Sequence, residues 1–323
     1  MPKLPFTPSD DSTQPLTAYA NGVPHQRLHW QTFDDKKLKV YLRRDDIASD
    51  HYPGNKWYKL FYNLQTMINK GHHTVVSFGG AYSNHIHALA ALGQQYDINT
   101  VGIIRGYPPL SDALSPTLQD AKAWGMCLRF LGYGDYRNKD LRQYQEWLDA
   151  EYGEYYCLPE GGDNLLGAQG CQAIGASVNR YCQQTLGVND YTLCAAMGTG
   201  TTFAGIVSSL PTTVSCLGFS SLKGEDTLSA HIAQRLLELN SSHSNWQVLN
   251  EYHHGGYAKT TPELLRFMLA MESANDLLLE PVYSAKMLWG IDQLAQADYW
   301  PEGSTIVAIH GGGLQGRRGF FKE

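Results

Sequence analysis

The middle of the chain alternates between short apolar segments and longer segments whose apolar residues recur at helical spacing. The apolar segments of strand length lie at residues 74–78, 100–104, 127–131 and 155–158. Amphipathic stretches that begin near Asn84, Ser115 and residue 141 separate these segments. Strands and helices that alternate in this way are joined by right-handed crossovers, which produce a parallel sheet. The pattern therefore predicts one compact α/β unit over residues 57–159.

A second alternating series fills the C-terminal half of the chain. Its apolar segments lie at residues 191–194, 214–218, 247–249 and 305–309. Residues 40–42 form one more predicted strand, and we expect residues 1–56 to join this second unit. The pattern thus predicts a larger domain made of residues 1–56 and 160–323, with residues 57–159 as a smaller inserted domain.

Composition and charge narrow the classes of protein that need consideration. The chain has 323 residues and a formal net charge of -6, and its lysines and arginines are scattered along the sequence. Such a chain offers no basic surface for nucleic acid. It contains no run of about 18 apolar residues, and its first eight residues hold no apolar signal core. We therefore expect a soluble cytoplasmic protein that binds neither nucleic acid nor membrane.

Neither the cysteines nor the histidines predict a metal site. The six cysteines show no close pairs and several lie in apolar segments, which indicates buried, reduced thiols rather than disulfides or zinc ligands. The adjacent His253 and His254 have no acidic or cysteine partner at ligand spacing, so we predict that they belong to a loop.

The residues around Lys56 are the strongest candidates for chemistry. Asn55 is a good N-cap for a helix whose apolar residues recur over residues 57–68. Lys56 and Lys59 lie on another side of the first turn, where they repel each other and the helix dipole. An anionic or electrophilic ligand, such as a phosphate-bearing aldehyde, relieves that repulsion. Two solvated surface lysines are the alternative, and that is the commoner situation for lysine.

Two glycine-rich turns follow predicted strands and open predicted helices. Residues 197–205 read Met-Gly-Thr-Gly-Thr-Thr-Phe-Ala-Gly, and residues 77–85 read Ser-Phe-Gly-Gly-Ala-Tyr-Ser-Asn-His. Glycines let several backbone N–H groups point inward, and a helix N-terminus favours an anion. The first turn is predicted to bind phosphate, and it lacks the lysine of a nucleotide P-loop. In the second turn, Ser83 and Asn84 are expected at the helix cap, a position that capping alone also explains.

Taken together, these segments resemble the family of 1-aminocyclopropane-1-carboxylate (ACC) deaminase and D-cysteine desulfhydrase, which depend on pyridoxal phosphate (PLP). The likeness begins with Gly-Asn-Lys-x-x-Lys-Leu and continues over most of the chain, at residues 54–60, 77–87, 159–170, 196–205, 280–290 and 309–316. The resemblance implies PLP fold type II, the fold type of tryptophan synthase β. That fold has two three-layer α/β/α domains with twisted, mostly parallel sheets, and its site lies in the cleft between them. It also implies a homodimer.

The resemblance implies roles for individual residues as well. Lys56 would form the Schiff base with the cofactor, and Lys59 would hold the cofactor phosphate. The phosphate cradle would consist of Gly198, Thr199, Gly200, Thr201 and Thr202. Ser83 would meet the substrate carboxylate, and Asn84 would hydrogen-bond to the phenolic oxygen of the cofactor.

Two tyrosines are further candidates, because they lie in segments similar to family motifs. Tyr283 belongs to a Pro-Val-Tyr segment and Tyr257 to a second tyrosine loop, and either would polarise the substrate or move protons. Any tyrosine chosen blindly among 20 is more often a packing or surface residue. We assign no role to His85, and we expect His87 to be a packed histidine.

Two positions depart from the family's pattern. ACC deaminases carry a glutamate directly after the Pro-Val-Tyr tyrosine, where it is associated with the pyridine nitrogen, but this chain has Ser284. D-cysteine desulfhydrases have a small hydroxyl residue there and usually a later His-Thr-Gly-Gly turn, whose threonine hydroxyl lies near the same nitrogen. Here that turn has Gly311 in place of the threonine. Either Ser284 or a water is left to take the place of the missing hydroxyl.

The leading hypothesis is a PLP-dependent lyase or deaminase that converts a small amino acid to a 2-oxo acid and ammonia. D-cysteine desulfhydrase-like activity comes first, followed by ACC deaminase and by another D-amino-acid lyase or dehydratase. From a different class, a PLP-binding homologue with weak or no catalysis is the alternative, because Gly311 weakens the site. A serine hydrolase is excluded, since the chain has no Gly-x-Ser-x-Gly elbow.

Overall fold

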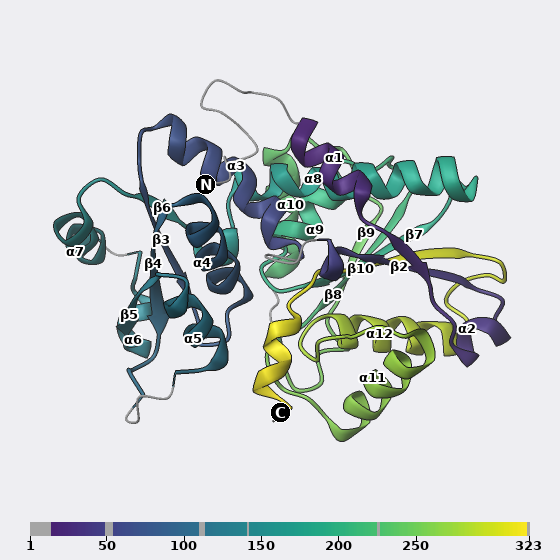
Figure 1. Ribbon diagram of the computed structural model, residues 1–323. Coiled ribbons are helices and arrows are strands. Elements are labelled where there is room, and N and C mark those ends of the chain that lie inside the picture. Colours follow the sequence, from purple (N-terminus) through teal and green to yellow (C-terminus); the bar gives the residue numbers. More distant parts are fainter. Residues whose placement is uncertain (1–13, 49–53, 110–113, 141, 225–226, 322–323) are drawn as a thin grey trace.

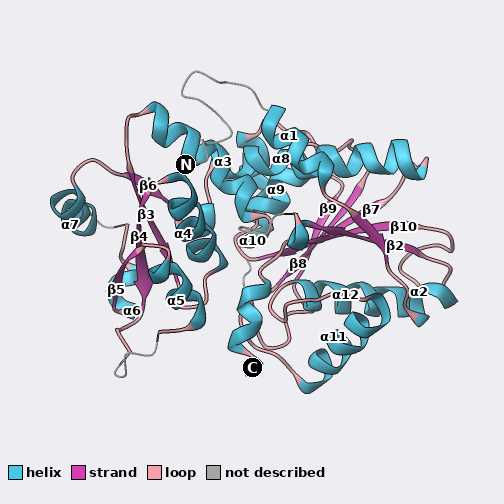
Figure 2. Ribbon diagram, viewed as in Figure 1, coloured by secondary structure: helices cyan, strands magenta, loops and turns pink. Residues whose placement is uncertain are grey.

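Two separate sheets, each covered by helices on both faces, organise the chain (Figures 1 and 2). The computed structural model describes residues 14–48, 54–109, 114–140, 142–224 and 227–321. This arrangement confirms the predicted mixed α/β fold with two three-layer units.

The larger sheet has six strands in the order β1-β2-β10-β7-β8-β9. Its strands are β1 (His25–Arg27), β2 (Lys39–Arg44), β10 (Thr305–His310), β7 (Thr192–Met197), β8 (Ser215–Ser220) and β9 (Trp246–Leu249). All neighbours run parallel except β1 and β2. The strand predicted at residues 40–42 lies beside β10, so the N-terminal segment contributes to this sheet as expected.

Helices cover both faces of the larger sheet because its central strands are apolar on both sides. Along β7, Leu193 packs into the core on one face and Cys194 into the core on the other. One face carries α1 (Gln14–Gly22), α8 (Leu165–Tyr181), α9 (Thr201–Ser208) and α10 (Leu228–Glu238). The other carries α2 (Gln31–Asp35), α11 (Pro262–Asn275) and α12 (Ser284–Gln296).

The smaller sheet has four parallel strands in the order β5-β4-β3-β6. Its strands are β5 (Cys127–Leu131), β4 (Asn99–Arg105), β3 (Thr74–Gly79) and β6 (Tyr156–Leu158). One face packs on α4 (Asn84–Tyr96) and α5 (Pro116–Ala123), and the other on α6 (Tyr133–Arg137) and α7 (Arg142–Tyr152). All four strands predicted between residues 74 and 158 are confirmed.

Helix α3 (Lys56–Asn69) lies between the two units and shares its apolar face with both. Leu60 and Phe61 are fully buried in a core that also contains Leu16 of α1 and Ile174 of α8. That core continues into α4 of the smaller unit. The predicted boundary between residues 56 and 57 falls inside this helix, so the division into two domains stays a prediction.

A buried polar network anchors the start of α3 to the larger sheet. Arg43 Nε lies 2.8 Å from Asp45 Oδ2, and both side chains are fully buried. Tyr58 of α3 donates to Asp45 Oδ1 at 2.8 Å and accepts from Arg43 Nη2 at 2.9 Å. A buried charge pair is tolerated when hydrogen bonds satisfy its remaining atoms, as they do here. The network therefore fixes the first turn of α3, which carries Lys56 and Lys59.

The prediction of buried, reduced cysteines is correct for four of the six and wrong for two. All six are free thiols, but Cys157 is exposed and Cys127 is partly exposed. Cys157 lies on the edge strand β6, where alternation sends it to the opposite face from the buried Leu158.

Among the residues that the structure describes, no helix is long and apolar enough to cross a membrane. The expectation about a signal core concerns residues 1–8, which lie outside the described ranges.

Candidate active site

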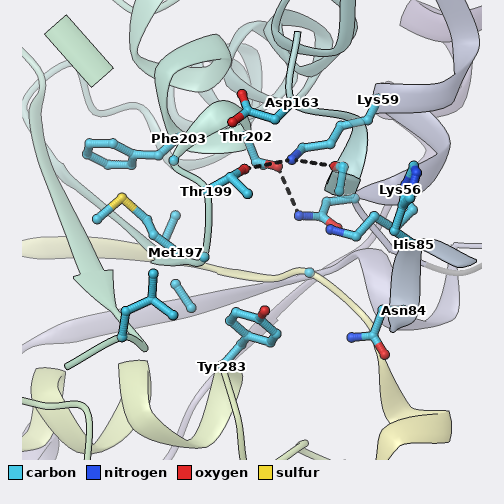
Figure 3. A pocket seen from close by; sticks show the side chains of 18 of the residues that line it. Lys56, Lys59, Asn84, His85, Asp163, Met197, Thr199, Thr202, Phe203 and Tyr283 are labelled. Carbon is cyan, nitrogen blue, oxygen red and sulfur yellow. Dashed lines mark hydrogen bonds between the residues drawn. The ribbon is translucent and has the colours of Figure 1, made fainter. Parts of the chain in front are cut away.

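A cavity of about 610 Å³ opens where the two units face each other (Figure 3). Its wall includes Lys56 and Lys59 at the start of α3, and it includes Ser83 and Asn84 at the start of α4. The segment from residue 195 to residue 200 contributes from the larger unit. The structure thus brings the two glycine-rich turns and the two lysines to a single cavity, although they are far apart in sequence.

Lys56 presents an unpaired amine to the cavity, as far as the described part of the chain shows. None of the described residues forms a hydrogen bond or an ion pair with it. Burial and the neighbouring charge of Lys59 lower the pKa of Lys56 to about 7. Near neutral pH a large fraction of this amine is therefore uncharged and able to act as a nucleophile or a base.

Lys59 connects α3 to the glycine-rich turn of the larger unit. Its side chain is buried, and its Nζ donates to Gly161 O at 3.0 Å and to Thr199 Oγ1 at 3.5 Å. Burial lowers the pKa of Lys59. In Figure 3 the amine points toward the threonines of the turn, where a bound phosphate would meet it.

Asn55 does not cap α3 as predicted. Its backbone is already helical, with φ -65° and ψ -10°, and its side chain makes no capping hydrogen bond. The amide instead donates to Thr202 Oγ1 at 3.0 Å, and the backbone N–H donates to Gly311 O at 3.0 Å. A cap requires an extended backbone, so the long-range acceptors take the place of the local one. Asn55 thereby joins α3 to the two segments that were predicted to hold the cofactor.

The turn after β7 has the geometry predicted for an anion cradle. Gly200 adopts φ 83°, and α9 begins at the next residue. A Cβ at Gly200 would lie 2.9 Å from Ile232 Cγ1, and a Cβ at Gly198 would lie 3.1 Å from the Tyr283 hydroxyl. Both glycines are therefore needed to keep the backbone close to its surroundings. Thr199 of this turn accepts from Lys59 Nζ at 3.5 Å, so the start of α9, where a helix favours an anion, lies near that amine.

One member of the predicted cradle, Thr201, does not line the cavity itself but bonds to two residues that do. Its hydroxyl donates to Asp163 Oδ1 at 2.6 Å and lies 2.8 Å from Thr199 Oγ1. Asp163 also lies 3.2 Å from Arg235 and from His231. Although burial opposes its charge, the hydrogen bond from Thr201 helps to hold the pKa of Asp163 below its usual range. Asp163, which sequence reasoning missed, thus fixes the threonines of the turn.

Ser83 and Asn84 begin α4, as predicted. Ser83 Oγ accepts from Ile86 N at 3.3 Å, which is a capping hydrogen bond. Asn84 Oδ1 accepts from Gln315 Nε2 at 2.7 Å, so its amide N–H₂ remains to donate. Gly313, with φ 88°, packs against that amide, because an added Cβ would lie 2.4 Å from Asn84 Nδ2. Gln315 and Gly313 therefore fix the orientation of the Asn84 side chain.

The two candidate tyrosines lie beside each other on the cavity wall. The ring centroids of Tyr257 and Tyr283 are 6.2 Å apart in an edge-to-face arrangement. Burial raises the pKa of both phenols, so both are protonated at neutral pH. Lys286 of α12 is buried and donates to Gly256 O at 2.8 Å. That bond ties the Tyr257 loop to the helix that follows Tyr283.

Ser284 and Gly311 both line the cavity, as the resemblance implied. The Ser284 hydroxyl donates to Glu280 O at 3.1 Å, and its oxygen accepts from Glu280 N at 2.9 Å. The Glu280 carboxylate accepts from the backbone N–H groups of Val282, Tyr283 and Ser284. Because the Ser284 hydroxyl hydrogen is already donated to Glu280 O, this side chain has no donor left for the cavity.

The two histidines of α4 differ in their surroundings. His85 is buried with Nε2 2.8 Å from Ser77 Oγ, and Ser77 donates to Leu158 O. Nε2 of His85 must then be the donor, and burial lowers the pKa of this histidine well below its usual value. His87 packs inside the protein at 3.0 Å from Asp120, which confirms the prediction for it.

The adjacent histidines 253 and 254 lie in the loop between β9 and α11, as predicted. Their rings bond within that loop, to Gly255 N and Thr261 Oγ1. No group of three histidines, cysteines or acids in the described ranges could hold a metal ion.

The residues present fit pyridoxal phosphate. The cofactor needs an unpaired amine in a buried cavity, which Lys56 supplies, and a cationic phosphate cradle, which Lys59 and the α9 turn supply. Asn84 supplies a fixed donor, and the glycine turns leave room for a ligand close to the backbone.

Comparisons with known proteins agree with this fit. The family model described as "Pyridoxal-phosphate dependent enzyme" matches residues 24–312. A bifunctional D-cysteine desulfhydrase/ACC deaminase of Arabidopsis thaliana is 28% identical over 97% of this chain and 83% of its own length. A putative ACC deaminase of Pyrococcus abyssi is 27% identical over 86% of each chain.

Solved structures share the fold. The crystal structure of an ACC deaminase homologue superimposes with a TM-score of 0.77 at 22% identity and covers 94% of this chain and 95% of its own. A hydrogen sulfide-producing enzyme of Fusobacterium nucleatum has a TM-score of 0.66 at 12% identity, with 95% and 99% covered. With the matched model spanning both sheets and the cavity, the chain belongs to the pyridoxal-phosphate-dependent enzyme family and has pyridoxal phosphate as its cofactor.

Proposed function

We propose that the protein eliminates the β-substituent of a small D-amino acid, with D-cysteine as the preferred substrate and pyruvate, sulfide and ammonia as products. The relatives support this reaction class, because one of them is named for D-cysteine desulfhydrase and ACC deaminase activities together. The observation that carries the choice is the pair Ser284 and Gly311 in the cavity wall. Neither residue has a carboxylate, and the nearby Glu280 carboxylate is turned to the backbone, where it accepts from the N–H groups of Val282, Tyr283 and Ser284.

The residues of the cavity divide the work of such a reaction. When bound at Lys56, pyridoxal phosphate supplies an electron-withdrawing ring next to the Cα of the amino acid. The Lys56 amine, whose pKa is lowered to about 7, can take the proton from Cα once the substrate amine has replaced it. Ser83 can donate its hydroxyl hydrogen to the substrate carboxylate. The Tyr283 phenol is protonated and can donate to the leaving group or the substrate.

The identity of the groups at Ser284 and Gly311 favours an easy elimination over a difficult ring opening. A carboxylate beside a pyridine nitrogen keeps that nitrogen protonated and increases electron withdrawal. Opening the cyclopropane ring of ACC demands this withdrawal, whereas a thiolate is a good leaving group and demands less. A site with Ser284 and Gly311 is therefore suited to D-cysteine.

We expect kcat/KM for D-cysteine to exceed kcat/KM for ACC by more than about tenfold, which corresponds to about 1.4 kcal/mol in the barrier. Release of 2-oxo acid would be measured side by side from ACC, D-cysteine, L-cysteine, β-chloro-D-alanine and D-serine. A clear preference for ACC would contradict the pyridine-nitrogen argument and select ACC deaminase, the second candidate, for which the putative Pyrococcus abyssi relative is named. Absence of product from every compound would favour a PLP-binding homologue without catalysis.

A second prediction concerns cofactor retention. Thr202→Val keeps the volume of the side chain but removes the hydroxyl that accepts from Asn55 and lies in the predicted cradle. A hydrogen bond to a charged group is worth about 1.5 to 3 kcal/mol, so the cofactor should dissociate roughly ten- to a hundredfold more readily. Dialysis followed by absorbance measures the cofactor that remains. Thr213→Val, on an exposed turn, is the matched control, and equal retention in both variants would remove Thr202 from the phosphate site.

We also propose, from the family resemblance alone, that the protein works as a cytoplasmic homodimer on a small amino-acid substrate. The Arabidopsis relative is named as mitochondrial, so relatives of this chain do not all share a cytoplasmic location. Light scattering on the purified protein gives the oligomeric state, and a monomer would contradict this proposal.

A further inference from the structure

Arg105 ends strand β4, and its guanidinium lines the same cavity as Lys56 and Tyr283. Its Nη2 lies 3.3 Å from the position that a Cβ on Gly80 would take. On the other side, its Cζ is 5.7 Å from the centroid of the Tyr136 ring. Among the described residues, none accepts a hydrogen bond from this guanidinium and none forms an ion pair with it. Such a cation on a cavity wall has its donors available for a ligand.

The acidic residues of the cavity are already paired with other cations. Glu160 Oε2 lies 3.8 Å from Lys139 Nζ. Asp163 lies 3.2 Å from Arg235 and 3.2 Å from His231, at the end of the cavity near the phosphate cradle. The charge of Arg105 is therefore not neutralised by the acidic residues around it. An anionic ligand beside Gly80 would therefore meet a cation without an acidic partner, although solvent screens the attraction.

The turn next to Arg105 offers a second donor for the same ligand. Gly80 and Ser83 belong to one turn, which is closed by a 3.0 Å hydrogen bond from Ser83 N to Gly80 O. Ser83 Oγ accepts from Ile86 N, so its hydroxyl hydrogen is free to donate. A carboxylate placed at this turn can therefore accept from the Ser83 hydroxyl and from the guanidinium together. The planar fork of arginine matches the two oxygens of a carboxylate.

We propose that Arg105 binds the carboxylate of the amino-acid substrate together with Ser83. The inference rests on the proposed function only in requiring an amino-acid ligand, and it holds for any side chain or chirality of that ligand. It makes the free carboxylate a condition for tight binding, so that amines, amides and esters of the same shape are excluded. The cationic group at Arg105 is thus a specificity determinant separate from the groups that hold the cofactor.

The test compares the binding of two ligands to variants of the cofactor-loaded protein. Glycine and glycinamide differ in the carboxylate, and the change in cofactor absorbance on addition of either gives its Kd without any elimination. We expect Arg105→Gln to weaken glycine binding about tenfold, the lower end for a charge-assisted hydrogen bond because the side chain is exposed to solvent. Glycinamide binding should change less than about twofold. Arg105→Lys keeps the charge but not the planar fork, so its Kd for glycine should lie between those of the wild type and of Arg105→Gln.

Arg129→Gln is the matched control, because it removes the same charge from an exposed arginine of the neighbouring strand β5. Arg129 is paired with Glu151 at 2.9 Å and lies outside this cavity. Its glycine Kd should equal that of the wild type. The cofactor content and the unfolding midpoint of Arg105→Gln should also match the wild type, which separates a binding effect from misfolding.

Three outcomes would overturn the inference. They are an equal loss for glycine and glycinamide, no loss for glycine, and a wild-type protein that binds both ligands equally. Failure of the proposed function can be told apart from these outcomes. In that case no compound in the substrate panel yields a 2-oxo acid, but Arg105→Gln still weakens the binding of glycine.

Discussion

Lys56→Ala is expected to reduce turnover by at least about a thousandfold and to remove the covalent, borohydride-reducible link to the cofactor. General acid–base catalysis alone contributes roughly a hundred- to ten-thousandfold, and alanine leaves neither a nucleophile nor a base at this point of the cavity. Among the described residues, the next amine on this wall is Lys59. It is directed to Gly161 and Thr199, so it is poorly placed to substitute.

Reduction with borohydride followed by peptide mass mapping locates the modified lysine. Lys70→Ala provides the control, since Lys70 is an exposed lysine at the end of the same helix. Lys59→Met provides the contrast, because it should weaken retention of the cofactor yet leave the reducible link in place. An adduct that persists in Lys56→Ala and maps to another lysine would contradict the assignment.

The fold could be predicted because its information is local. The apolar segments at 74–78 and 305–309 are buried on both faces, and they are short and separated by amphipathic stretches, which is typical of central parallel strands. Glycine turns after such strands can be recognised for the same reason, since few residues other than glycine adopt the positive φ that is found at Gly200. The same local signal exists at Ser83, where the cap formed as expected.

The partners of polar side chains could not be predicted, because they come from distant segments. Asn55 carries the local signature of an N-cap, yet its amide reaches Thr202, which is 147 positions away. Thr201 belongs to a plausible phosphate motif, but its hydroxyl donates to Asp163 from another loop. Each case shows tertiary hydrogen bonding overriding a local preference.

Residues that acquire meaning only from their position were missed for a related reason. Arg105 ends an ordinary apolar strand, so in the sequence it resembles any solvated charge. Glu280 had a usable signal, because an acidic residue just before a helix start is typical of N-terminal capping. No comparable local pattern marks Lys286, whose partner is the Gly256 carbonyl in another loop.

The close approach of α3 and α8 gives the second large prediction, at Gly170. A Cβ added to Gly170 would lie 1.9 Å from the carbonyl oxygen of Tyr58, far below any contact that real atoms make. Gly170→Ala must therefore push the two helices apart. Overpacking a core costs about 1 to 3 kcal/mol, and neither the Tyr58 carbonyl oxygen nor a Cβ can move aside by side-chain rotation. We expect a matching loss in the free energy of unfolding, measured by urea denaturation.

The same displacement should damage the site, because Tyr58 lies between Lys56 and Lys59 on α3. Cofactor retention in Gly170→Ala should fall even at low urea, where the protein is still folded. A loss of global stability alone would leave retention unchanged under these conditions. Gly134→Ala is the control: nothing lies within 4 Å of its added Cβ, and it sits in helix α6. Alanine there should stabilise by about 0.4 to 1 kcal/mol. Wild-type stability and retention in Gly170→Ala would show that the spacing between α3 and α8 does not position the lysines.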